Sequence, residues 1–223
     1  MSEQNLIKKL LIKERMQRSL NWITPSVTSL LTSSPDLVLA GGGIASKLNI
    51  TKSGDYDLFY LGDKSLSEFV KTIRHIGILN QMSLKFNGFH HDVCTFSHDK
   101  SFKDAPKIQI IKKENCHTLE SVLESFDLVP CMIGMRWNIK EGELEVFADR
   151  RTLKAIARKS IEFNKVVYPL VAMKRFLKYH DKGYSCDDVQ MRTFLEQIHT
   201  RLLTYNLSED ISKDEMWASY SKV

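Results

Sequence analysis

The sequence is poor in cysteine, proline and glycine and has no long apolar run, which excludes several classes of protein. It contains only four cysteines, five prolines and ten glycines in 223 residues, which excludes a disulfide scaffold, a collagen-like chain and a low-complexity chain. It has no run of about 18 apolar residues, so we expect no membrane span. The basic, amphipathic N-terminus lacks the apolar stretch of a secretory signal, which predicts a cytoplasmic location.

The overall composition is that of a folded domain. Hydrophobic residues make up 43% of the chain and charged residues 26%, enough apolar surface to exclude intrinsic disorder. The net charge of +5 permits a polyanionic partner without requiring one. The scattered cysteines show no metal-ligand spacing.

Hydrophobic periodicity predicts an α+β fold, in which a mixed sheet with flanking helices precedes a helical C-terminal module. We expect a first domain over residues 1–148 and the helical module over 149–223. Strands are predicted at 37–40, 55–61, 107–111, 127–135 and 143–147. Asn87-Gly88 predicts the turn of a hairpin over 82–97. Helices are predicted at 3–22, 44–48, 65–76, 118–126, 150–159, 168–181 and 188–205, with an interruption at Pro25 and a polar helical tail after 205.

The apolar segment Leu37–Ala40 runs directly into three consecutive glycines, Gly41, Gly42 and Gly43. Glycine lets a backbone approach a ligand closely, and the start of a helix presents free N–H groups and a positive dipole end. A lone glycine triplet is usually a turn. Placed between a buried strand and a helix, it is also typical of a phosphate-binding site.

Asp55 and Asp57 lie two residues apart on a predicted strand, so their carboxylates share one face while Tyr56 and Leu58 point to the other. Neighbouring carboxylates repel each other unless a cation lies between them. Mg²⁺ prefers hard oxygen ligands and shares them with substrate phosphates. Together with the glycines, this pair predicts phosphoryl or nucleotidyl transfer.

The combination resembles the nucleotidyltransferase superfamily of the polymerase β type. In that family a hydrophobic residue and a glycine pair precede Asp-hydrophobic-Asp-hydrophobic, which matches Gly41, Gly42, Asp55 and Asp57. Poly(A) polymerases, CCA-adding enzymes and compact phage or viral proteins of this fold look similar over residues 30–185. The chain departs from the CCA-adding enzymes in having Gly43-Ile44-Ala45-Ser46 without their Arg-Asp. Phosphate contacts would then come from backbone N–H groups, helped by Ser46 or Lys47.

The resemblance also implies a third metal-binding carboxylate on a later strand. The segment that looks equivalent reads Ile108-Gln109-Ile110, with an amide where the family has an acid. Asp127, next to an apolar segment, is the preferred alternative. Asp92 is the second choice, and the absence of any third ligand is the remaining one.

The resemblance therefore implies a Mg²⁺-dependent enzyme, with Mn²⁺ as an alternative ion, that transfers NMP from an NTP to an acceptor hydroxyl and releases pyrophosphate. Arg175 and Lys178 would contact the triphosphate and Tyr179 would stack on the base. The expected acceptor is an RNA 3′ end such as that of tRNA, in a bacterial or infected-host cytoplasm. The alternatives are a toxin-type enzyme that nucleotidylates protein, and a degenerate module that binds RNA or a partner.

A second basic segment precedes the helix that carries Arg175. Arg150, Arg151, Lys154, Arg158 and Lys159 fit either a solvated helix face or contacts with the phosphate backbone of an RNA acceptor. Nothing in the sequence indicates an oligomeric state.

Overall fold

The computed structural model describes residues 25–49, 55–77, 79, 84–90, 92–98 and 106–204. The helix predicted over residues 3–22 and the tail predicted after 205 lie outside these residues. Within them, no helix has both the length and the apolar character needed to cross a membrane.

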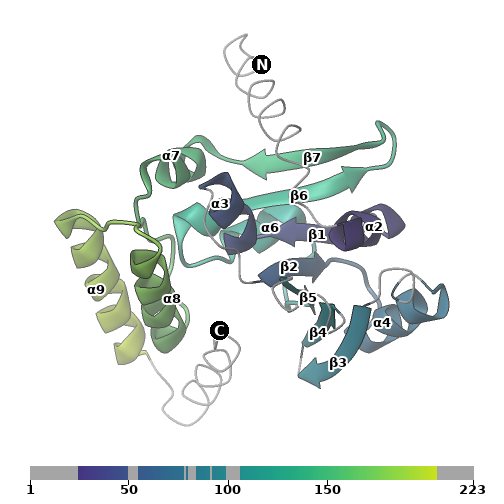
Figure 1. Cartoon of the computed structure of the whole chain (residues 1–223). Helices are drawn as coiled ribbons and strands as arrows, with labels where there is room; N and C mark the ends of the chain where they lie inside the picture. Colours follow the sequence, from purple (N-terminus) through teal and green to yellow (C-terminus); the bar gives the residue numbers. More distant parts are fainter. Residues whose placement is uncertain are drawn as a thin grey trace.

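A seven-stranded mixed sheet organises the described part of the chain (Figure 1). Its strand order is β3-β4-β5-β2-β1-β6-β7, in which β2 and β5 are parallel and every other neighbouring pair is antiparallel. The strands are β1 (Leu37–Ala40), β2 (Asp55–Tyr60), β3 (Leu84–His90), β4 (Val93–His98), β5 (Lys107–Ile111), β6 (Ile133–Asn138) and β7 (Glu143–Ala148).

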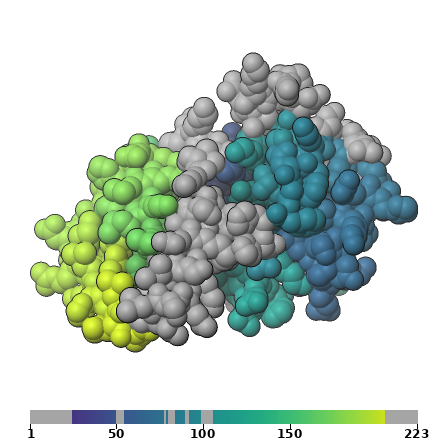
Figure 2. Space-filling view, turned by 90° about the horizontal axis from the view of Figure 1, so that it is seen from below, coloured from purple at the N-terminus to yellow at the C-terminus, as the bar shows by residue number. Residues whose placement is uncertain are grey.

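Helices cover both faces of this mixed sheet, and the fold is of the predicted α+β class. They are α2 (Pro25–Ser33), α3 (Gly42–Leu48), α4 (Leu66–His75), α6 (Leu119–Glu124), α7 (Arg150–Arg158), α8 (Pro169–Asp181) and α9 (Asp188–Leu203), with the 3₁₀ turn η3 (Val129–Cys131). Residues of α2, α3 and α4 contribute to one hydrophobic core. Residues of α6, α8 and α9 contribute to a second core. Seen from below, α8 and α9 lie at one side of the molecule, and α4 lies at the other with β3 and β4 (Figure 2).

The alternation along β2 explains how its carboxylates come to face one side. Tyr56 and Leu58 are fully buried in the first core, as predicted. Asp55, Asp57 and Phe59 therefore share the opposite face. Phe59 belongs to the second core, and its ring meets that of Phe126 edge-on with the centroids 5.8 Å apart.

Two local predictions are wrong. Asn87-Gly88 does not form the hairpin turn: it lies inside β3, where the register with β4 shifts between Phe86 and Gly88. Gly88 has a φ of 129°, so its conformational freedom supports a bulge here. The predicted strand over 127–135 begins instead as η3, with Pro130 inside it, and β6 starts at Ile133. The predicted helices also omit α2, which begins at Pro25; proline is tolerated in a first helical turn.

The helical region after β7 shares a core with the sheet. Tyr179 of α8 and Phe194 of α9 lie in the same buried cluster as Val38 and Ala40 of β1. The division into units 1–148 and 149–223 stays a prediction.

Candidate active site

The two strand carboxylates lie in the middle of the sheet, next to the glycine turn. In the strand register Asp57 stands between Ala40 of β1 and Gln109 of β5. Residues paired in this way share a face, so Gln109 lies beside Asp57. The amide thus stands at the position where the family resemblance implies the third carboxylate.

Gly41 places the start of α3 against Asp57. It is the N-cap of α3, has a φ of 96° and donates its N–H to the carbonyl of Ile133 at 2.9 Å. A methyl group built on Gly41 would lie 3.9 Å from Asp57 Oδ2 and 3.1 Å from Phe126 Cζ. The glycine turn and the carboxylate are therefore close neighbours, as the sequence pattern predicts.

The close packing of Tyr179 against Gly42 leaves no room for a side chain at this position. A methyl group at this position would lie 2.8 Å from the hydroxyl oxygen of Tyr179, closer than van der Waals contact. Tyr179 is 4% exposed, and its hydroxyl accepts a hydrogen bond from the Cys131 thiol at 3.0 Å. Gly42 thus allows α8 to pack directly against the start of α3.

The electrostatics at the carboxylate pair favour a cation. Burial, and after it the charge of Asp55, raises the pKa of Asp57 to about 6. Burial also raises the pKa of Asp55, although Lys107 and Lys178 oppose this shift. A bound cation would stabilise both ionised carboxylates and remove their mutual repulsion.

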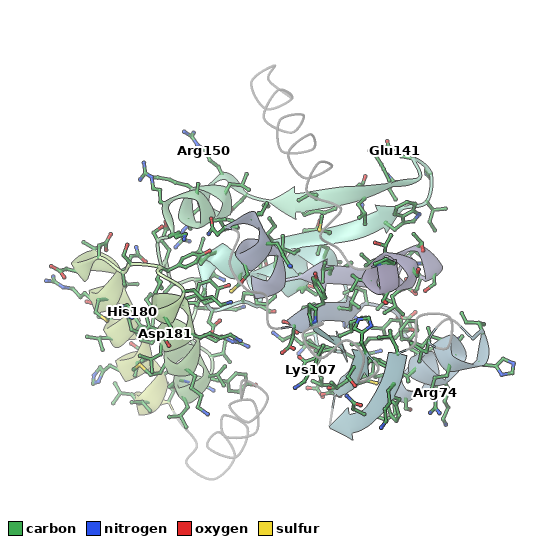
Figure 3. All side chains as sticks on the ribbon, in the orientation of Figure 1. Arg74, Lys107, Glu141, Arg150, His180 and Asp181 are labelled. Atoms are coloured by element: carbon green, nitrogen blue, oxygen red, sulfur yellow. The ribbon has the colours of Figure 1, made fainter. Side chains whose placement is uncertain are left out.

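Basic side chains from two parts of the chain surround this pair. Arg175 and Lys178 of α8 lower the pKa of Asp57 by their charge, and Lys178 does the same for Asp55, so the structure brings both predicted cations to the carboxylates. Lys107, which is labelled in Figure 3, pairs with Asp55 where β5 and β2 begin.

Sequence reasoning missed Lys113. Its charge also acts on Asp57, and its ammonium donates to Ser125 Oγ at 2.9 Å and lies 5.7 Å from the ring centre of Phe126. Burial and the charge of Arg175 lower the pKa of Lys113 to about 8. Its place just after the end of β5, beside the strand carrying Asp57, is the signal that could have identified it.

Asp127 is bound to arginine and not placed as a third metal ligand. Its Oδ1 accepts from Arg175 Nη1 at 2.9 Å and from the Leu128 N–H at 3.1 Å, and the residue is 7% exposed. No group of three or more acidic, histidine or cysteine side chains suited to a metal occurs among the described residues. The prediction that Asp127 joins Asp55 and Asp57 around the metals is therefore wrong.

Three further predicted roles are also corrected by the structure. Asp92, the second choice of third ligand, is exposed in the turn between β3 and β4 instead of on a strand. Ser46 is 2% exposed, and its hydroxyl accepts a hydrogen bond from Lys182 Nζ at 2.8 Å. Its hydroxyl is therefore not available to bind phosphate. Tyr179 is buried and packs edge-on against Tyr184, so its ring is not available for stacking on a base.

The remaining ligands fit one divalent ion better than two. Mg²⁺ is commonly held by one or two carboxylates, waters and substrate phosphates. Asp55 and Asp57 supply the carboxylates, and the side-chain oxygen of Gln109 is a neutral hard donor beside them. A site for two ions held by three acids does not fit the described residues.

Comparison with solved structures shows a nucleotidyltransferase fold. A CCA-adding enzyme in complex with CTP superposes with a TM-score of 0.61 at 12% identity, over 85% of this chain and 47% of that chain. The Thermotoga maritima CCA-adding enzyme complexed with tRNA gives a TM-score of 0.57 at 13% identity, over 82% of this chain and 44% of that chain. At these identities the likeness concerns the fold.

Sequence comparison identifies the family. A protein of Bacillus phage SPbetaL7 named Gabija anti-defense 2 is 26% identical over 191 residues, which cover 83% of this chain. The match spans 42% of the length of that relative. Residues 10–159 match the family described as Gabija anti-defense 2 family protein, Gad2, and the chain therefore belongs to this family.

Proposed function

We propose that the chain is a metal-dependent nucleotidyltransferase, which transfers NMP from an NTP to an acceptor hydroxyl and releases pyrophosphate. The observation that carries this proposal is the pair Asp55 and Asp57 on one face of β2, with Asp57 next to the Gly41 turn. The nucleotidyltransferase fold of the solved relatives supports it.

Each part of the site then has a role. The N–H groups at the start of α3, in Gly42 and Gly43, face the phosphates, since a helix start has free donors and a positive dipole end. Arg175 and Lys178 neutralise the triphosphate, and Asp127 holds the guanidinium of Arg175 in place. Asp55 and Asp57 hold Mg²⁺ or Mn²⁺, which when bound stabilises negative charge on the transferring phosphate.

The acceptor that we propose is an RNA 3′ end, such as that of tRNA. Solved relatives of the same fold are described in complex with tRNA and with CTP, which supports this choice. The family description and the phage source of the relative support an anti-defense role in an infected bacterium. A protein side chain is the alternative acceptor, because a defense component could itself be modified.

A second candidate function is nucleotide binding without transfer. Gln109 favours it, because this amide stands where the fold family carries a third acid, and Asp127 is already paired with Arg175. On this reading the metal–nucleotide complex binds to Asp55 and Asp57, but no carboxylate is left to activate the attacking hydroxyl.

The experiment incubates the protein with each of the four labelled NTPs and Mg²⁺, first with total RNA and then with protein extract. We expect label to appear in RNA, and Asp55→Asn or Asp57→Asn to lower the rate by about 10²-fold or more. Asp63→Asn, in the exposed turn after β2, is the control with unchanged rate. Calorimetry with NTP and Mg²⁺ separates the candidates: metal-dependent affinity without transfer supports the binding function. Full activity of both carboxylate variants would refute the role of Asp55 and Asp57, on which both candidate functions depend.

A further inference from the structure

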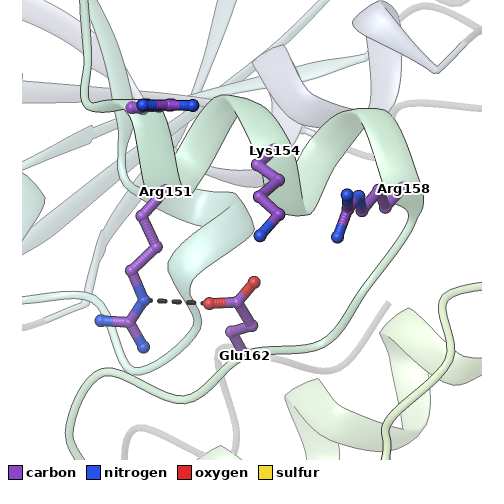
Figure 4. A pocket seen from close by; sticks show the side chains of 5 residues that line it. Arg151, Lys154, Arg158 and Glu162 are labelled. Carbon is purple, nitrogen blue, oxygen red and sulfur yellow. Dashed lines mark hydrogen bonds and ion pairs between the residues drawn. The ribbon is translucent and has the colours of Figure 1, made fainter.

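A basic pocket lies on α7, away from the carboxylate pair. Its volume is about 640 Å³, and it is lined by Arg150, Arg151, Lys154, Arg158 and Glu162. Figure 4 shows the labelled side chains Arg151, Lys154 and Arg158 along one helix, with Glu162 facing them from the segment that follows. Neither Asp55 nor Asp57 lines it.

Most of the positive charge in this pocket is not neutralised by the protein. Arg151 is held in place: its Nε pairs with Glu162 Oε2 at 2.9 Å, and its Nη2 donates to the carbonyl of Phe163. Arg150, Lys154 and Arg158 are exposed and have no carboxylate within ion-pair distance in the described part of the chain. Arg150 projects away from the body of the molecule (Figure 3). Three cations are therefore available to an external anion.

Two of the basic side chains, Arg150 and Arg151, lie at the end of the helix that is unfavourable for a cation. α7 has no acidic residue in its first turn, where Arg150 and Arg151 face the positive end of the helix dipole. Cations at a helix start cost stability, and Asp149 compensates only as the N-cap, accepting from the Thr152 N–H at 2.6 Å. An anion bound at this end would interact favourably both with the side chains and with the dipole.

The spacing of the cations fits a chain of phosphates. Arg150, Lys154 and Arg158 follow one another at four-residue intervals, which at a rise of about 1.5 Å per residue separates them by about 6 Å. Successive phosphates of a nucleic-acid strand are a similar distance apart, whereas carboxylates in a folded protein follow no such repeat. No aromatic side chain lines the pocket, so it offers no stacking platform for a base.

We infer that the α7 pocket binds the phosphodiester backbone of the acceptor RNA strand. This inference rests on the proposed function, because it takes the acceptor to be RNA. α7 lies beside α3 in the fold (Figure 1), and the side chain of Asn49, at the end of α3, donates to the carbonyl of Ile156 in α7 at 3.0 Å. A strand held on α7 is therefore bound next to the helix that starts at the glycine turn.

The test measures the fluorescence anisotropy of a labelled single-stranded RNA with the full chain, in EDTA and without NTP. The test variant combines Arg150→Gln, Lys154→Gln and Arg158→Gln. The control combines Lys64→Gln, Lys71→Gln and Lys140→Gln, which removes the same charge from exposed positions elsewhere. For three lost phosphate contacts, the dependence of log K on log salt should become shallower by about 2, with at least about tenfold weaker binding at about 50 mM salt.

The control variant should bind RNA almost as tightly as the unaltered protein. Unchanged RNA affinity of the α7 variant overturns the inference, and so does an equal loss in both variants, which would indicate net charge alone. RNA binding is measured here in EDTA and without NTP, so this readout does not depend on nucleotidyl transfer. Failure of nucleotidyl transfer with intact α7-dependent RNA binding would therefore refute the proposed function and leave the α7 site standing.

Discussion

At the scale of single residues, Asp57 is the side chain of the site whose ionisation is most unfavourable in the protein without metal. It is largely buried, lies beside a second carboxylate and has no direct ion pair among the described residues. Its pKa of about 6 reflects this cost in the protein without metal. A carboxylate kept in such surroundings is typical of a site built to hold a cation.

Asp57→Asn should stabilise the metal-free protein at neutral pH. The pKa of Asp57 rises from 3.8 to about 6 on folding, so the penalty for its ionisation is absent below pH 3.8, grows between the two values and is complete above pH 6. Above pH 6 the variant should be more stable by about 1–3 kcal/mol, and near pH 3.5 the two proteins should be roughly equal. Thermal denaturation in EDTA across this range measures the difference.

Mg²⁺ provides the complementary measurement. It should raise the melting temperature of the unaltered protein and leave that of Asp57→Asn almost unchanged, because the variant lacks one of the two ligands. Asp63→Asn should show neither effect. A metal-free Asp57→Asn protein that is less stable at pH 7 than the unaltered protein would contradict this interpretation.

At the scale of elements, α8 is the helix that brings basic side chains to the carboxylates of the sheet. It places Arg175 and Lys178 near the carboxylates of β2, and Arg175 also binds Asp127 in the segment between α6 and η3. The Asp127 side chain is 9% exposed and that of Arg175 is 35% exposed, so the pair is partly shielded from water. Asp127 thus acts as the partner that positions α8.

Asp127→Asn should weaken the docking of α8 without removing a metal ligand. Loss of the charge leaves Arg175 with a neutral partner, and we expect a decrease in stability of about 1–3 kcal/mol. Urea denaturation measures this cost, and calorimetry should still show Mg²⁺-dependent NTP binding, although weaker. Asp181→Asn, an exposed position on the same helix, is the matched control. Complete loss of the metal dependence would instead identify Asp127 as a ligand.

The elements that the sequence predicts well are those with strong local signals. The apolar segment before Gly41 and the alternation from Asp55 to Tyr60 each form the expected strand, and Lys107–Ile111 has the bounds predicted for it. The helix predicted from residue 65 is present as α4, with Ser65 and Glu68 forming a capping box at its start. These signals are local, because periodicity and capping depend on residues a few positions apart.

The wrong predictions depend on distant contacts. Whether Asn87-Gly88 turns or bulges is decided by the register of β3 against β4, which a local motif does not contain. The burial of Ser46 and Tyr179 follows from the packing of α8 on α3, more than a hundred residues apart in the sequence. Asp127 likewise meets Arg175 only in the folded chain.

At the scale of the whole molecule, one core joins the sheet and the last helices. The cluster that contains Val38 and Phe126 also contains Ala172, Tyr179 and Phe194. Without α8 and α9 the sheet would expose this apolar face to water. The predicted units 1–148 and 149–223 should therefore be interdependent in folding.

A chain ending at residue 148 should fail to fold cooperatively. It retains all strands of the described sheet but loses the side chains that cover the second core. We expect a broad thermal transition and poorly dispersed amide resonances, where the full chain shows a single sharp transition. A cooperative melt of this fragment would show that residues 1–148 form an autonomous domain.

One side-chain amide fastens three segments of the molecule together. Asn49 Nδ2 donates to the Ile156 carbonyl at 3.0 Å and to the Tyr184 hydroxyl at 2.7 Å, so the end of α3 is tied to α7 and to the connection between α8 and α9. Hydrogen bonds from one residue therefore join these three segments. An RNA strand on α7 would thus be bound to a helix that is anchored to the far end of α3, the helix that begins at the glycine turn.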